Sequence, residues 1–409
     1  MKCIFLGNPA PVKFVAETVN TNFSVADNIA QNNVIEGLYQ HYHDDFAVIT
    51  TAANFGNPHV LNKATRKQSV KLDCGADAIA VGNLNYNKLI YYLSIIVTYT
   101  MTLFKVLKRM KASSTDNTFV IITSGPYIFV SLPIFFVRLV YKICYIPFLI
   151  GSVELPDYGG LFKVISKLSV IMVKMADGSI TYVERSSEDY THKPYVSILY
   201  SLNRESIALS NSMIDNCVHN EKFTVAYTGA LTRIKGMDKL VQVVRATGNT
   251  YKWVICGNGE YGNEIQKLSQ NTDYDVEFLG IVTNEKSLEV QHNADLLLAL
   301  QSLDTPAYRY YSTYAASGKL VEYLLSGTPI LTPDIGAISR KIKPYLNFLD
   351  NQDTETIVNK LNEMSNTKSL SELRDKADAG RTYVIENANN DVQNRNILEF
   401  IEKCHAEKK

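Results

Sequence analysis

The stretch from Val225 to Gly336 constrains the fold of this chain more than any other feature. Its successive segments read VAYTGALTRIKGMDKL, KWVICGNGEYG, VEFLGIV and SGKLVEYLLSGTPILTPDIG. Most of them join an apolar strand to a glycine-containing or basic turn and then to a helical pattern. Such turns bring backbone N–H groups and a helix N-terminus close to a bound phosphate. The stretch therefore predicts a site for a nucleoside diphosphate on an α/β domain.

The first half of the chain shows the same alternation of strands and helices, which is typical of a parallel doubly wound sheet. Apolar runs predict strands over Cys3–Leu6, Phe46–Thr50, Phe119–Thr123, Tyr145–Ile150, Ser179–Val183 and Val196–Tyr200. In the second half, strands are predicted over Thr224–Tyr227, Trp253–Cys256, Val276–Leu279, Leu296–Leu300 and Pro329–Leu331.

The pattern predicts two Rossmann-like doubly wound domains that face a central cleft. Residues 1–203 form the first domain, residues 204–221 a polar linker, and residues 222–385 the second domain. A C-terminal helix over 386–409 is expected to pack back on the first domain. Ligands of such sheets bind outside the carboxyl ends of the strands, so the glycine-containing turns should all open on the cleft.

Charge and cysteine content exclude several classes of function. Lysine plus arginine and aspartate plus glutamate each count 41 in 409 residues, so no net field favours nucleic acid. The six cysteines are scattered without a CxxC pair, which disfavours a zinc knuckle and favours a reducing, cytoplasmic setting.

One apolar segment raises the question of a membrane. Leu89–Phe104 carries no charge and has apolar residues at helical spacing, but it is shorter than the roughly 20 residues of a spanning helix. Four cations follow it, Lys105, Lys108, Arg109 and Lys111. The segment is either a core helix with a solvated basic end or a helix that rests on an anionic membrane surface.

Two motifs in the second half suit a phosphate. Gly229 ends a strand, Arg233 and Lys235 follow in the turn, and Gly236 precedes a helix; the alternative is a solvated loop with two exposed cations. Gly257-Asn-Gly259-Glu-Tyr-Gly262 matches GxGxxG after a strand and before a helix. That pattern also suggests a nicotinamide site, but the dinucleotide fingerprint occupies the first βα turn of its domain.

The segment from Ser317 to Pro329 is the most specific one. It places Lys319 and Glu322 one helical turn apart, so that they share a face, or form an ion pair on a surface helix. The segment resembles the "KxxEYxxxGxP" form found in polysaccharide glycosyltransferases. Together with the preceding motifs, it resembles the donor-binding domain of retaining GT-B glycosyltransferases of the family-4 type over roughly residues 225–340.

The resemblance implies roles for individual residues. Arg233 and Lys235 would grip the donor diphosphate and stabilise it as the leaving group, and Glu322 would accept hydrogen bonds from the ribose hydroxyls. On the donor side the resemblance implies Gly229, Gly257, Gly259, Gly280, Ile281, Tyr314, Ser317, Gly318 and Lys319. On the acceptor side, small-residue loops after strands indicate Gly7, Asn8, Gly125, Glu154 and Asp157.

The sequence departs from the family at one position. The family often carries a second glutamate ahead of the one at Glu322, and Tyr314 occupies that place here. Asp304 is the nearest upstream acid and would replace it only if the loop folds back. The aromatic cluster of Tyr308, Tyr310, Tyr311 and Tyr314 would either stack on a sugar or pack the cleft.

Metal and cofactor sites are not expected. Asp273-Tyr-Asp275 precedes a strand where a metal-binding DxD would follow one, and His41-Tyr-His43-Asp-Asp45 suits a solvated helix end. The sequence thus predicts a cytoplasmic enzyme, peripheral on the inner face of the plasma membrane. It would transfer a sugar from a nucleoside-diphosphate sugar, UDP-linked, to a glycan or lipid-linked acceptor in cell-surface polysaccharide synthesis. The alternatives are an NAD-dependent oxidoreductase and a non-catalytic protein that binds nucleotide sugars or a membrane surface.

Overall fold

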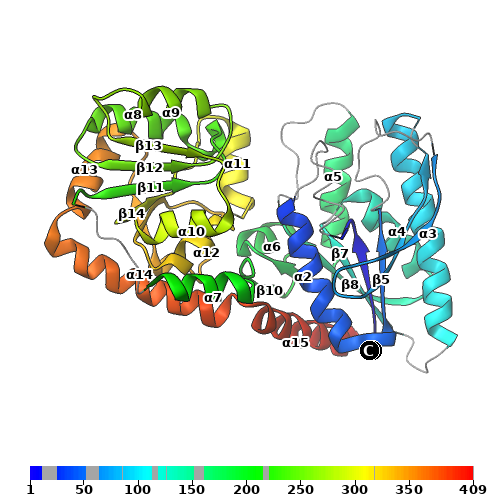
Figure 1. The fold of residues 1–409 in the computed structure, drawn as a ribbon. Coiled ribbons are helices and arrows are strands. Elements are labelled where there is room, and N and C mark those ends of the chain that lie inside the picture. The colour runs from blue at the N-terminus through cyan, green and yellow to red at the C-terminus, as the bar shows by residue number, and fades with distance from the viewer. Residues whose placement is uncertain are drawn as a thin grey trace. The chain divides into compact units, whose positions relative to one another are not determined.

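The computed structural model describes residues 1–11, 25–51, 64–84, 86–112, 118–125, 127–151, 161–214, 221–316 and 318–408. The chain forms two compact units (Figure 1). Unit 1 comprises Met1–Ser201 together with Asn390–Lys409, and unit 2 comprises Leu202–Asn389.

Unit 1 is built on an eight-stranded sheet in the order β10-β9-β8-β7-β1-β2-β5-β4. All pairings are parallel except that of β4 with β5. In chain order the strands are β1 (Lys2–Gly7), β2 (Phe46–Thr50), β4 (Gln68–Lys71), β5 (Asp77–Ala80), β7 (Thr118–Ser124), β8 (Lys142–Leu149), β9 (Ser179–Thr181) and β10 (Tyr195–Ser197). A two-stranded sheet pairs β3 (Ala64–Thr65) with β6 (Asn83–Leu84).

Helices cover both sides of this sheet. Helices α3 (Lys88–Ala112) and α4 (Ile128–Arg138) pack on the side that carries Ile4, Leu6 and Ile121. Helix α5 (Leu161–Lys174) packs against α4, and the short α6 (Glu184–Tyr190) follows β9. Helices α2 (Val25–Tyr42) and α15 (Asn390–Lys408) pack against each other and against the strands, and a short 3₁₀ turn, η1 (His43–Asp45), precedes β2.

Unit 2 contains a six-stranded, all-parallel sheet in the order β13-β12-β11-β14-β15-β16. Its strands are β11 (Thr224–Thr228), β12 (Lys252–Cys256), β13 (Val276–Gly280), β14 (Leu296–Leu298), β15 (Ile330–Pro333) and β16 (Asn347–Leu349). The chain runs outward from β11 in one direction and then, from β14, in the other. A doubly wound sheet binds its ligand at this switch point, beyond the carboxyl ends of the strands.

The helices of unit 2 fill the connections between its strands. They are α7 (Arg204–Met213), α8 (Met237–Thr247), α9 (Gly262–Ser269), α10 (Asn284–His292), α11 (Pro306–Tyr314), α12 (Lys319–Ser326), α13 (Thr354–Met364) and α14 (Thr367–Asn387), with 3₁₀ turns η3 (Arg233–Lys235) and η4 (Lys343–Tyr345). The core includes Trp253, which is fully buried together with the apolar side chains of β11, β14 and α8.

The structure corrects the sequence analysis in two places. Residues 204–213 form helix α7 of unit 2, where a linker was expected; Asn203 caps this helix by accepting a hydrogen bond from Ser206 N at 2.6 Å. Strands β5, β4 and β16 were missed because they are short and only partly apolar. The apolar helix and its basic end are confirmed as one helix that continues to Ala112, since lysine and arginine are good helix formers.

Candidate active site

Three glycines shape the turns at the switch point of unit 2. Gly229, Gly257 and Gly259 have φ values of 138°, 140° and 157°. A Cβ on Gly257 would lie 1.8 Å from the carbonyl oxygen of Gly229, and one on Gly259 would lie 2.4 Å from that of Leu231. Only glycine allows the two turns to approach this closely. The turns after β11 and β12 therefore form one surface, and Leu231 N donates to Asn258 O across it at 2.9 Å.

The two predicted diphosphate-binding cations follow in η3. Arg233 is exposed, and its guanidinium lies 3.5 Å from Asp304 and 3.9 Å from Asp238. Lys235 is half-buried, and burial lowers the pKa of its ammonium. The loop after β14 thus folds back as far as Arg233. Asp304 contacts the arginine there. The sequence analysis considered Asp304 only as a replacement for the missing glutamate and did not predict this contact.

Lys319 is the most constrained cation of the site. Its Nζ lies 3.7 Å from the centroid of the Tyr227 ring and 5.8 Å from that of Tyr323. A Cβ on Gly229 would come within 2.6 Å of the same Nζ, so the first glycine turn also leaves room for the lysine. Burial lowers the pKa of Lys319 well below its usual range; nearby Lys235 acts in the same direction, and Glu322 opposes the shift.

Glu322 lies in the first turn of α12, one turn beyond Lys319. Both residues are described, and they form no ion pair; Lys319 lies over the tyrosine rings instead. The surroundings raise the pKa of Glu322 through desolvation, an effect that Lys319 opposes. The carboxylate is exposed to solvent on one side and is free to accept hydrogen bonds from a ligand.

Helix α12 is fixed from behind by Tyr323. The Tyr323 hydroxyl donates to Thr228 O at 3.1 Å and accepts from Thr228 N at 2.9 Å, so the helix is tied to the end of β11. Its N-cap is Gly318, while Ser317 lies outside the described residues. The N-terminus of α12 thus contributes its positive dipole end beside Lys319.

The remaining predicted donor residues lie on two flanking segments. Gly280 ends β13 with φ 62° and accepts from Gly257 N at 2.7 Å, and the next residue, Ile281, is 78% exposed. Tyr314 ends α11, where its ring lies 4.8 Å from that of Tyr310. Tyr310 and Tyr311 contact each other as well, at 6.1 Å between ring centroids.

Unit 1 has a pocket at its own switch point, between β1 and β7. Gly7, Asn8 and Ser124 line it at the strand ends, and four aromatic residues complete it, Tyr91, Tyr92, Tyr127 and Phe129. The Tyr127 and Phe129 rings stack at 5.4 Å and 2°, and Tyr92 stacks on Phe129 at 5.7 Å and 24°. Flat apolar rings beside amide and hydroxyl groups suit a sugar ring, which has both apolar C–H faces and hydroxyl edges.

Asn8 is held in place at the edge of this pocket. Gln31 of α2 accepts from Asn8 N at 3.0 Å and donates to Asn8 Oδ1 at 2.7 Å. Gly125 has φ 77°, and its N–H donates to Phe148 O at 2.8 Å. Glu154 and Asp157 lie outside the described residues. The sequence identified the loop residues of this pocket but not its tyrosines, which come from α3 and from the start of α4.

The described part of the chain holds no cluster of three or more His, Cys, Asp or Glu side chains arranged for a metal ion. Asp275 is ion-paired with Lys222 at 2.9 Å, and His41 lies 3.4 Å from Glu402. The two metal-like sequence patterns thus have structural partners.

Residues 214–381 match the family model for glycosyl transferases group 1. Unit 2 is therefore similar to the group 1 glycosyl transferases. This match covers the turns, η3 and α12, which are the segments that carried the resemblance. A comparison with curated proteins gives no match for the chain.

Solved structures of glycosyltransferases share the fold of the whole chain. Sucrose-phosphate synthase from Thermosynechococcus elongatus is 14% identical, with a TM-score of 0.62 and full coverage of both chains. Anabaena HepE in complex with UDP is 13% identical, with a TM-score of 0.63, and covers 98% of this chain and 100% of its own. A glycosyltransferase from Rickettsia africae is 12% identical, with a TM-score of 0.63 and 98% coverage of both chains. The predicted GT-B fold is confirmed.

Proposed function

We propose that this protein transfers a sugar from a UDP-sugar to a glycan or lipid-linked acceptor in cell-surface polysaccharide synthesis. One observation carries the proposal. The glycine turns, Lys235, Lys319 and Glu322 meet at the switch point of unit 2, in the segment that matches the group 1 glycosyl transferases. Convergent cations and the N-terminus of α12 suit a diphosphate, and the carboxylate suits a ribose.

The choice of UDP draws support from a structural relative. Anabaena HepE has been solved with UDP and with UDP-glucose. In this chain the exposed Gly280–Ile281 segment would form the wall for the nucleobase, bound chiefly by backbone contacts.

The chemistry is positioning together with charge stabilisation. The bond between the anomeric carbon and the diphosphate oxygen breaks, a new bond to an acceptor oxygen forms, and the acceptor proton passes to the departing phosphate. Lys235, Lys319 and Arg233 would neutralise the diphosphate, with Arg233 exchanging Asp304 for phosphate oxygens. Retention of the anomeric configuration, without a metal, is the outcome that the family resemblance implies.

Unit 1 would bind the acceptor. The stacked rings of Tyr92, Tyr127 and Phe129 offer a platform for a sugar, and Asn8 and Ser124 offer hydrogen bonds at its edge. This pocket supports a saccharide acceptor, either free or carried by a lipid. We place the enzyme in the cytoplasm, peripheral on the inner face of the plasma membrane.

The position of the GxGxxG segment argues against the nicotinamide alternative. Gly257–Gly262 follows β12, the second strand of unit 2, whereas a dinucleotide fingerprint follows the first. The acids at the expected distance are occupied elsewhere, because Asp275 pairs with Lys222 and Glu277 pairs with Lys252 at 3.2 Å.

Binding of UDP tests the proposal directly. Wild-type protein should be stabilised by UDP in a thermal-shift assay and not by NAD, by about 2.7 kcal/mol at a hundred times the dissociation constant. Glu322→Gln should weaken UDP binding by roughly 1.5–3 kcal/mol in calorimetry, because a charged acceptor is lost. Glu264→Gln, on the exposed end of an ion pair with Arg245, is the matched control. Equal UDP affinity in wild type and Glu322→Gln would show that Glu322 does not touch the nucleoside.

A further inference from the structure

Exposed apolar side chains concentrate on one region of unit 1. Apart from Ile29, Ile214 and Ile281, every large hydrophobic residue that the described part of the chain exposes lies on or beside α3, α4 and α5. They are Leu84, Tyr86, Leu89, Ile90, Leu93, Val97, Met101, Tyr127, Phe135, Phe136, Leu139, Val140, Val164, Leu168 and Ile171. We call this region the α3–α5 surface. So large an apolar area on a soluble domain indicates an interaction site.

The exposed residues follow the helical repeat. On α3, Leu89, Leu93, Val97 and Met101 are spaced four apart, and each is more than half exposed. The opposite side of α3 is buried in the core through Tyr91, Ile95 and Tyr99. On α5, Val164, Leu168 and Ile171 form a similar stripe. Both helices thus have one side in the core of unit 1 and an apolar stripe in solvent.

The charge of this surface is of one sign. Helices α3, α4 and α5 contain no aspartate or glutamate. Exposed cations border both stripes: Lys105, Lys108, Arg109 and Lys111 on α3, and Lys163, Lys167 and Lys174 on α5. By contrast, α2 and α15 contain Asp27, Glu36, Asp391, Glu399, Glu402 and Glu407. The acid-free region ends at Asp177, which follows α5 and pairs with Arg138 at the end of α4; α6 then contains Glu184, Glu188 and Asp189.

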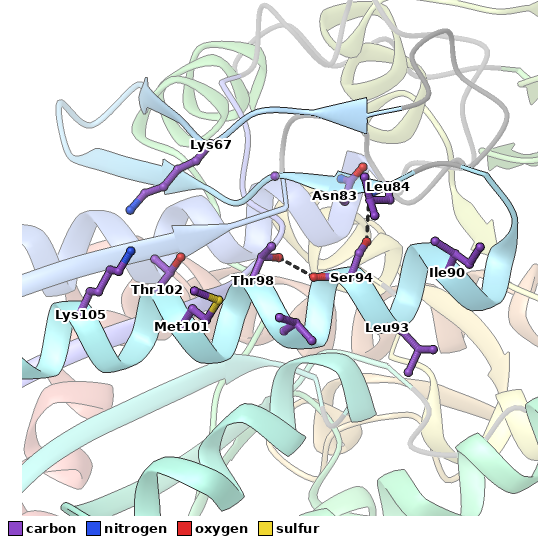
Figure 2. A pocket seen from close by; sticks show the side chains of 12 residues that line it. Lys67, Asn83, Leu84, Ile90, Leu93, Ser94, Thr98, Met101, Thr102 and Lys105 are labelled. Carbon is purple, nitrogen blue, oxygen red and sulfur yellow. Dashed lines mark hydrogen bonds between the residues drawn. The ribbon is translucent and has the colours of Figure 1, made fainter.

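A groove runs along α3 within this surface. It has a volume of about 610 Å³ and is lined by Leu84, Ile90, Leu93, Val97 and Met101. Figure 2 shows Lys67, from the loop before β4, and Lys105, from α3, extending toward the same end of the groove. Two polar groups in its wall are paired internally, since Leu84 N donates to Ser94 Oγ and Thr98 Oγ1 donates to Ser94 O. The groove is therefore apolar along its length and cationic at one end.

Helix α3 passes the length and composition test for a membrane span over Leu89–Ala112, with a mean hydropathy of 1.5, and a third of that window is buried. Its buried residues pack on the central strands of unit 1, however. A helix that forms part of a domain core cannot also be surrounded by lipid, so α3 presents its exposed stripe to a surface.

We propose that the α3–α5 surface docks on an anionic phospholipid bilayer, with the α3 groove as the seat of a lipid whose phosphate lies between Lys67 and Lys105. Charge complementarity selects this occupant. Apolar stripes bordered by lysine and arginine, without acids, match the layered structure of an anionic leaflet, where apolar side chains enter the acyl region and cations meet the headgroups. A protein partner or a second copy would need acids to pair with these cations, and this surface has none to offer a copy of itself.

This inference deepens the proposed function by giving the enzyme access to lipid-linked acceptors, but its evidence lies in unit 1 alone. The test is flotation with vesicles of phosphatidylcholine alone and of phosphatidylcholine mixed with phosphatidylglycerol. Wild type should float with the anionic vesicles and be released as salt screens the charges. Three variants divide the surface. One changes Lys105, Lys108, Arg109 and Lys111 to Gln, the second changes Lys163, Lys167 and Lys174 to Gln, and the third changes Leu93, Val97 and Met101 to Ser.

The two cation variants should each lower the vesicle partition coefficient about ten-fold or more, since each cation near an anionic leaflet contributes about a factor of five. The apolar variant should lower the coefficient as well, because it removes side chains that would enter the acyl region. The control changes Lys193, Lys267 and Lys403, exposed cations outside the surface, to Gln and should bind as wild type does. All variants change exposed residues and should keep the UDP affinity of wild type. The α5 variant is decisive, because a loss confined to the α3 variants would reduce the docking surface to one helix and overturn the proposal.

Two further results would overturn it. One is that wild-type protein floats with neither vesicle type. The other is a dimer in sedimentation velocity that the Leu93–Val97–Met101 variant disperses, with no vesicle binding, which would assign the surface to a second copy. The proposed function fails separately: absence of UDP binding with intact vesicle binding would remove the transferase proposal and leave the membrane surface standing.

Discussion

The pockets of the two units are lined by different parts of the chain, backbone turns in unit 2 and side chains in unit 1. In unit 2 the switch point is formed by backbone, because Gly229, Gly257 and Gly259 bring two turns into contact beside the cations of η3 and α12. In unit 1 the corresponding place is lined by side chains, with Tyr91, Tyr92, Tyr127 and Phe129 around Asn8. Nucleoside-diphosphate sugars share the diphosphate, so one arrangement of backbone turns and cations can serve many of them. An acceptor is particular to each enzyme, and exchangeable side chains suit it.

The largest expected effect is a loss of transfer activity in unit 2 variants that leaves vesicle binding by unit 1 intact. Arg233→Ala and Lys235→Ala should each lower the rate of UDP release from a UDP-sugar by about 10²–10³, as for loss of one charge-stabilising group. Vesicle binding through unit 1 should stay unchanged. Arg245→Ala, which removes an exposed ion pair between α8 and Glu264 of α9, is the control. Unaltered rates in both variants would exclude η3 from the site.

A second prediction tests whether backbone really builds the unit 2 site. Gly257→Ala would place a Cβ 1.8 Å from Gly229 O at φ 140°, so unit 2 should lose about 3 kcal/mol of unfolding free energy. Gly262→Ala is the matched control, since no atom lies within 4 Å of the position that its Cβ would occupy. Urea unfolding followed by fluorescence reports unit 2 alone, because Trp253 is the only tryptophan of the chain and is fully buried there. Equal midpoints for the two variants would contradict the prediction.

The same difference explains what the sequence could predict. A turn that requires positive φ and close approach restricts its positions to glycine, so the residues of the donor side stand out at Gly229, Gly257 and Gly259 in a linear reading. The strongly apolar strands β7, β8 and β12 were predicted for a similar reason, since burial on both faces demands continuous apolar runs.

The aromatic pocket of unit 1 left no such pattern. Tyr92 and Phe129 are far apart in the chain and meet only because α3 and α4 pack on the same side of the sheet. In the sequence, each of them looks like an ordinary residue of a helix. Asp304 was likewise undecidable, because its contact with Arg233 depends on the path of the loop after β14. Loops and packing, unlike glycine turns, are fixed by tertiary structure.

A third prediction concerns acid sensitivity, which unit 2 should show. His292 is buried, and its ring nitrogen lies 3.0 Å from Ser210 Oγ. Burial, with a contribution from Arg381, lowers the pKa of His292 to about 4 from a usual value near 6.5. As the pH is lowered below 6.5, His292 of the unfolded chain binds a proton, whereas His292 of the folded protein stays neutral down to about pH 4. The free energy of unfolding therefore decreases as the pH is lowered from 6.5 to 4.

The expected loss between pH 7 and pH 5 is about 2 kcal/mol. His292→Gln keeps a partner for Ser210 without a titrating group, so its unfolding free energy, followed by Trp253 fluorescence, should change less over the same interval. Parallel pH profiles for the two proteins would show that His292 does not govern the acid response.

The last prediction is that removal of metal ions has no effect on either activity. Chelation by EDTA should leave both UDP release and vesicle binding at their original values, because cations of the chain itself are proposed to neutralise the diphosphate. Activity lost on chelation and restored by Mn²⁺ would return attention to Asp273, Asp275 and the His41–Asp45 segment.

Helix α15 has a consequence for how the chain is made. Unit 2 is one continuous segment, whereas unit 1 needs Asn390–Lys408 from the far end of the sequence, with Ile397 and Ile401 buried in it. All of unit 2 therefore precedes α15 in the chain, and unit 1 is completed only after every residue of unit 2 has been made. We expect a chain that stops at Asn389 to keep the native fluorescence of Trp253 while limited proteolysis cuts unit 1; resistance of both units would show that unit 1 closes without α15.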